Sequence, residues 1–108
     1  MAAAGTFAAA LTPAQFVRQF TAVIYEDYGP IQTLDTLCNL RNNPEDRQAI
    51  KMAFIVFLQD RLTSAKQSLR NFELLSDDPS TDPSVENGRK RVHRCETAIR
   101  TIEDTQMQ

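Results

Sequence analysis

The chain has 108 residues, which is enough for one domain with a single modest hydrophobic core. Hydrophobic residues make up 42% of the chain, and only three glycines and no tryptophan are present, which argues against a turn-rich β fold. The net charge of −2 argues, taken alone, against a nucleic-acid binder, but the charges are distributed unevenly. Residues 73–86 contain five acids and no base, whereas residues 89–100 contain five arginines or lysines against Glu96 alone. The second of these segments is therefore strongly cationic.

The first eleven residues are small and apolar but lack the basic region that opens a signal peptide, so we expect an irregular, flexible arm and a cytosolic protein. No stretch approaches the roughly 20 apolar residues of a membrane-spanning helix, and no membrane partner is expected. Cys38 and Cys95 are too few and too far apart for a zinc or redox motif. Both lie on apolar stripes, which predicts buried free thiols.

The first two helices are predicted at residues 12–28 and 30–41. Thr12-Pro13-Ala14-Gln15 has the residues of a capping box with proline at the first helical position, and Gly29-Pro30 separates the two helices. Apolar residues recur at helical spacing in both predicted helices: Phe16, Val17, Phe20, Val23 and Ile24 in the first, and Ile31, Leu34, Leu37 and Cys38 in the second.

Two more helices are predicted at residues 44–75 and 83–104. Asn43 and Asp82 are suited to cap them, each followed by a proline, and Pro79 together with Pro83 marks the segment between the helices as a linker. The third helix keeps an apolar face for about six turns, from Ile50 to Phe72. The fourth has an apolar seam: Val85, Gly88, Val92, Cys95, Ile99 and Ile102. Four amphipathic helices predict an all-α, antiparallel four-helix bundle, with residues 1–108 forming one domain.

Nothing in the sequence forms a recognisable catalytic or metal-binding constellation. His93 is the only histidine, and its neighbours Val92 and Arg94 are not metal ligands. Asp77 and Asp78 are adjacent carboxylates in the linker, where solvated turn residues are the simpler interpretation. A glycine-rich phosphate loop is missing as well. We therefore expect no enzyme activity, no catalytic residue, no metal and no cofactor.

The basic residues of the fourth helix form the most informative feature. From helical rotation we expect Lys90, Arg94 and Thr101 on one flank of the apolar seam and Arg91 and Ala98 on the other. Arginine suits phosphate because its planar fork donates hydrogen bonds in pairs, so an anionic partner is favoured over a merely solvated helix face. Aromatic residues are not interleaved with these arginines, so we expect contact with a nucleic-acid backbone and no base stacking.

Several short motifs occur in the same order as in a known family. They are Thr12 to Val17, Pro30-Ile31, Leu37-Cys38-Asn39, Arg70-Asn71, and the segment from Asp82-Pro83 through Arg91-Val92 to Ala98-Ile99-Arg100. Together they span most of the chain and resemble the coat proteins of the tobamoviruses. The chain is shorter than those proteins. It also has His93 and Arg94 where the family has two acidic residues, which makes this helix more basic.

The resemblance implies a four-helix coat subunit that joins identical subunits in a helical homo-oligomer around single-stranded RNA. It would be found in the virion, and in the host cytoplasm during assembly. The residues predicted to bind RNA, from the resemblance and the basic cluster together, are Arg70, Arg89, Lys90, Arg91, Arg94 and Thr101. The alternative is a small helical protein–protein interaction module, such as a chaperone or adaptor, that binds no nucleic acid. A helix-turn-helix DNA binder is disfavoured because the proline-rich linker is longer than the turn of that motif.

Overall fold

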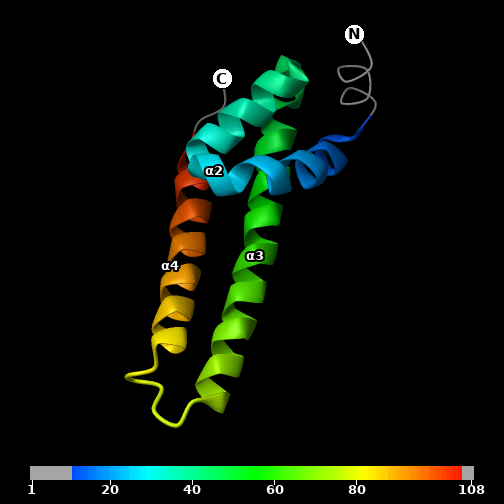
Figure 1. Cartoon of the computed structure of the whole chain (residues 1–108). Coiled ribbons are helices and arrows are strands. Elements are labelled where there is room, and N and C mark those ends of the chain that lie inside the picture. The colour runs from blue at the N-terminus through cyan, green and yellow to red at the C-terminus, as the bar shows by residue number, and fades with distance from the viewer. Residues whose placement is uncertain (1–10, 106–108) are drawn as a thin grey trace.

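A computed structural model describes residues 11–105, except the side chains of residues 23, 26 and 27, and all of its elements are helical (Figure 1). Their order is α2 (Pro13–Arg41), the short 3-10 helix η1 (Pro44–Asp46), α3 (Arg47–Leu75) and α4 (Pro83–Asp104). The predicted all-α fold is confirmed. The arm expected at residues 1–11 lies outside the described residues apart from Leu11, and so does the side chain of Val23. Within the described range, no helix is both long and apolar enough to cross a membrane.

Helix α2 begins with the predicted capping box and is kinked in its middle. The Thr12 hydroxyl accepts a hydrogen bond from the Gln15 amide at 3.2 Å, and the Gln15 side-chain oxygen accepts one from the Thr12 amide at 3.0 Å. Gly29 has φ 75° and ψ 175°, which no helix allows and which glycine adopts without a steric penalty. Pro30 then restarts the helix. The two helices predicted here are thus two helical segments of one kinked element.

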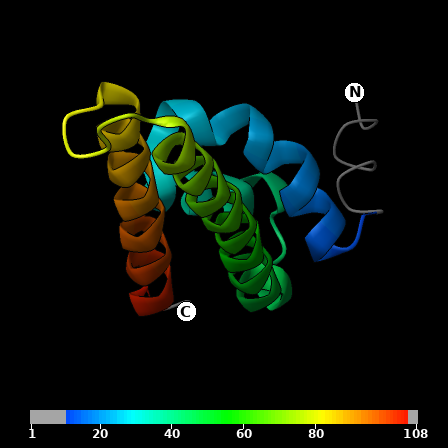
Figure 2. The same ribbon diagram turned by 90° about the horizontal axis from the view of Figure 1, so that it is seen from below.

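Helices α3 and α4 form a long antiparallel hairpin, and α2 lies across only part of it. Figures 1 and 2 show α2 crossing the end of the hairpin where α3 begins and α4 ends. The fully buried core lies at this crossing and includes Phe16, Leu37, Ile50, Phe54, Leu58 and Ile102. The other half of the hairpin, towards the linker, extends beyond α2, and the molecule is accordingly elongated at 55 × 28 × 19 Å.

In this arrangement, two residues that were predicted to lie on buried apolar faces are exposed. Phe72 is 44% exposed because it lies in the half of the hairpin that α2 does not reach. Ile31 is 50% exposed, directly after the kink. Cys38 and Cys95 are buried free cysteines, as predicted, and burial raises the pKa of the Cys38 thiol.

Helix α4 begins where the sequence predicted, with Asp82 as its cap. The Asp82 carboxylate accepts a hydrogen bond from the Ser84 amide at 2.8 Å, and Pro83 occupies the first helical position. Hydrogen bonds from the Ser76 hydroxyl and from the Ser84 amide lower the pKa of the Asp82 carboxyl. The same carboxylate therefore joins the start of the linker, at Ser76, to the start of the basic helix.

The lowered pKa of Asp82 predicts a dependence of stability on pH. A carboxyl with a lower pKa in the folded state stabilises that state above its unfolded pKa, near 3.9, and loses this effect as pH falls through the folded value. Asp82→Asn keeps an amide oxygen for the cap but removes the titration. We expect its free energy of unfolding to fall less than that of the wild type between about pH 5 and pH 2. Urea unfolding followed by circular dichroism measures this difference, and parallel pH profiles would contradict the expectation.

Candidate nucleic-acid interface

An open groove of about 1050 Å³ lies between the kink of α2, the middle of α3 and the adjacent face of α4. We call it the kink groove. Its lining includes the following side chains, from all three helices: Tyr25, Phe57, Asp60, Arg61, Ser64, Arg91, Arg94, Thr97, Ala98 and Thr101. Three arginines thus line the groove, and Asp60 is the one acidic residue among the lining residues that the structure describes.

Arg91, Arg94, Ala98 and Thr101 lie on the same side of α4, since all four line the kink groove. The interpretation that put Arg91 and Ala98 on the opposite flank from Arg94 and Thr101 is therefore wrong. At about 100° of rotation per residue, these four positions fall within about 80° of one another. The sequence spacing alone is therefore sufficient to place these four residues on one side of α4.

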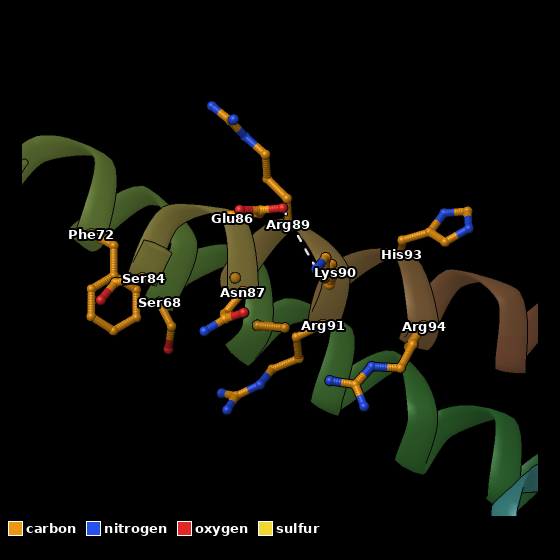
Figure 3. A pocket seen from close by; sticks show the side chains of 12 residues that line it. Ser68, Phe72, Ser84, Glu86, Asn87, Arg89, Lys90, Arg91, His93 and Arg94 are labelled. Carbon is orange, nitrogen blue, oxygen red and sulfur yellow. Dashed lines mark ion pairs between the residues drawn. The ribbon is translucent and has the colours of Figure 1, made fainter. Parts of the chain in front are cut away.

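No carboxylate in the described part of the chain neutralises Arg91 or Arg94. Among the side chains that the structure describes, neither guanidinium lies within 4.0 Å of a carboxylate. Both side chains are exposed, and Figure 3 shows them extending to one side of α4 while Arg89 and His93 extend to the other. Two adjacent cationic forks on one helix face are suited to bind an anion such as phosphate.

Two other residues that were predicted to bind RNA form ion pairs with acidic side chains of the chain itself. Arg89 lies 3.6 Å from the Glu73 carboxylate on α3, and Lys90 lies 3.5 Å from Glu86 one turn earlier on α4. These ion pairs are exposed and contribute little to stability, but they place an acid beside each base. Arg89 and Lys90 both line a second groove of about 850 Å³ between α3 and α4, drawn in Figure 3. We call it the hairpin groove.

Arg70 and Thr101 differ in their relation to the kink groove. Thr101 lines it, and its hydroxyl donates a hydrogen bond to the Thr97 carbonyl at 2.8 Å. Arg70 is exposed on α3 but lines neither groove. Ser68 lines both grooves, and Arg70 is two residues further on, about 200° around the helix. Within one chain, the structure therefore does not bring Arg70 together with Arg91 and Arg94.

Sequence reasoning missed the aromatic side of the kink groove. The Arg61 guanidinium carbon lies 5.3 Å from the centroid of the Tyr25 ring and 5.5 Å from that of Phe57, and all three residues line the groove. No aromatic residue accompanies the arginines along α4, but the fold brings aromatic rings of α2 and α3 to the same groove. Phe57 and Arg61 are four residues apart, which was the local signal for their contact. The proximity of Tyr25 depends on how α2 crosses α3.

Comparison of the chain with protein-family models, with curated proteins and with solved structures finds no match. The fold and the groove define an all-helical chain with a cationic groove beside a kinked helix.

Proposed function

We propose that the chain is a structural coat subunit that assembles with identical copies into a helical particle around single-stranded RNA. The observation that carries this proposal is the pair of guanidiniums of Arg91 and Arg94 in a groove on α4, neither of which is paired with a carboxylate of the described residues. The same helix contains the longest motif that resembles the tobamovirus coat proteins. A polymer of phosphates is the partner that best suits such a surface, because each bound phosphate releases condensed counterions.

RNA contact of this kind depends mainly on the phosphate backbone. Arginine forks position a strand without reading its bases, so binding is expected to be weakly selective for sequence and to weaken steeply with salt. Weak selectivity suits a protein that must cover the whole length of an RNA. The acids at Glu73 and Glu86 limit the contribution of Arg89 and Lys90, and the strand is therefore expected to follow the Arg91 side of α4.

Contacts between subunits are supported by apolar side chains on the outside of the molecule. Met52 and Val56 are both more than half exposed and lie one turn apart on α3, and Leu40 of α2 is similarly exposed. Large exposed apolar side chains are typical of surfaces that another protein covers. In a helical particle, each such surface would meet a different surface of the next copy.

Electron microscopy and sedimentation of the purified protein, with and without RNA, test the proposal. We expect rods whose length follows the length of the RNA at about 50 mM salt, and their dissociation as the salt rises well above 200 mM. A protein that stays a monomer or dimer under all these conditions, and that does not retain RNA, would contradict the coat function.

The alternative is a helical protein–protein interaction module. It is favoured by one observation, the exposed apolar end of α3, where Phe72, Leu74 and Leu75 lie beyond the reach of α2. A chaperone or adaptor would use this end to bind a partner without nucleic acid. RNA binding at low salt separates the two functions, since only the coat subunit requires it.

A further inference from the structure

We infer that the kink groove is a nucleotide-binding site in which one base of a single-stranded RNA stacks against the Tyr25–Arg61–Phe57 cluster while Arg91 and Arg94 hold an adjacent phosphate. This inference rests on the proposed RNA-binding function and adds to it, because it places a base as well as the backbone. The juxtaposition that carries it is the presence of two aromatic rings and three arginines in one open groove.

The aromatic cluster packs against the buried core, which holds its rings in place. The Tyr25 and Phe57 ring centroids are 6.1 Å apart with the ring planes at 70°. Both rings contact Phe54, which is fully buried, at centroid distances of 5.9 and 6.3 Å. Tyr25 and Phe57 are themselves only partly buried and line the groove. The cluster is therefore a preorganised apolar surface, and a base that stacks on it does not have to order it first.

Arg61 makes the cluster suited to a nucleobase in particular. Its guanidinium lies over both rings and belongs to the lining of the groove. Unpaired RNA bases stack on aromatic rings and on arginine guanidinium planes, and this cluster presents both kinds of surface. An aliphatic side chain of a protein partner has no planar ring and could not stack on the guanidinium in this way.

The opposite side of the groove supplies the anion contacts. Arg91 and Arg94 come from α4, whereas Phe57 and Arg61 come from α3 and Tyr25 from α2, so the base and phosphate contacts belong to different helices. Hydroxyl groups of Ser64, Thr97 and Thr101 also line the groove and can hydrogen-bond a ribose or a base edge. The volume of about 1050 Å³ is sufficient for a nucleotide, since small-molecule sites occupy roughly 300–1,000 Å³.

The inference is tested by comparing two probes of equal length and charge, an RNA oligonucleotide and an abasic ribose-phosphate oligomer. We expect the full-length protein to bind the RNA about tenfold more tightly than the abasic probe, since one stacked base contributes that much. Phe57→Leu should abolish this preference and leave binding of the abasic probe unchanged. The matched control is Phe20→Leu, because Phe20 is also a partly buried phenylalanine but lines neither groove.

Tyrosine fluorescence gives a second measurement that needs no change in the groove. The chain has two tyrosines and no tryptophan, so Tyr28→Phe leaves Tyr25 as the only strong fluorophore. Tyr28 is exposed and lies outside the kink groove lining. We expect RNA to quench Tyr25 in this variant and the abasic probe to bind without quenching.

The outcomes separate this inference from the proposed function. If the two probes bind equally, and neither Tyr25 quenching nor the Phe57→Leu substitution distinguishes them, the stacking site is wrong while RNA binding stands. If no probe binds at about 50 mM salt, both the coat function and the stacking site are wrong. Should Phe57→Leu fail to fold by circular dichroism, the quenching of Tyr25 in the Tyr28→Phe protein decides the question.

Discussion

Replacing Arg91 and Arg94 together by alanine is expected to lower the affinity for single-stranded RNA by about ten- to a hundredfold at low salt. The two guanidiniums lie in one groove, and no carboxylate that the structure describes neutralises them. Loss of two phosphate contacts should also reduce the slope of log K against log salt by about 1.4, from 0.7 per contact on a single strand. Fluorescence anisotropy with a labelled oligonucleotide at several salt concentrations measures both effects.

The control for this experiment is the double variant Arg18→Ala/Arg100→Ala. It removes the same net charge from two exposed positions that line neither groove. A general electrostatic attraction would make the two double variants equally weak, which would contradict the assignment of the site. A clear loss in the groove variant alone would support it.

Phe54→Ala is expected to lower the free energy of unfolding by about 3–5 kcal/mol. Phe54 is fully buried at the crossing of α2 and α3, and its ring contacts those of Tyr25 and Phe57. Removing the ring leaves a cavity that these rigid helices can fill only in part. Because small domains have only about 5–15 kcal/mol of stability, this loss is a large share of the total.

Urea unfolding followed by circular dichroism measures the effect of Phe54→Ala. Val56→Ala is the matched control, since Val56 lies two residues away on the same helix and is 54% exposed. We expect that substitution to change the free energy of unfolding by no more than about 0.5 kcal/mol. A similar, small loss in both variants would show that Phe54 is not in the core.

Local interactions explain why the starts of α2 and α4 could be predicted from the sequence, whereas residues 44–46 form the 3-10 helix η1 and α3 begins only at Arg47. The capping box of Thr12 and Gln15 and the Asp82 cap join residues no more than three apart. Gly29 and Pro30 interrupt the helix through their own backbone properties. Such signals do not depend on the rest of the chain, so the structure has them where they were expected.

Apolar periodicity identified the core of the bundle but could not set its extent. The pattern extends along α3 as far as Phe72, whereas α2 covers only the half of the hairpin nearest the start of that helix. Periodicity tells which face of a helix is apolar and not which other helix reaches it. The exposure of Phe72 is therefore a consequence of where α2 crosses the hairpin.

The candidate site, too, could be predicted from the sequence only in part. The sequence by itself determined four helical segments, the caps of α2 and α4 and a basic last helix with Arg91 and Arg94, because these depend on residues a few positions apart. Only the tertiary structure decided that Arg70 lies away from the groove and that Tyr25, Phe57 and Arg61 join the arginines of α4. The physical reason is that Tyr25 and Arg91 are 66 positions apart, and only the packing of α2 across the α3–α4 hairpin brings them to the same groove.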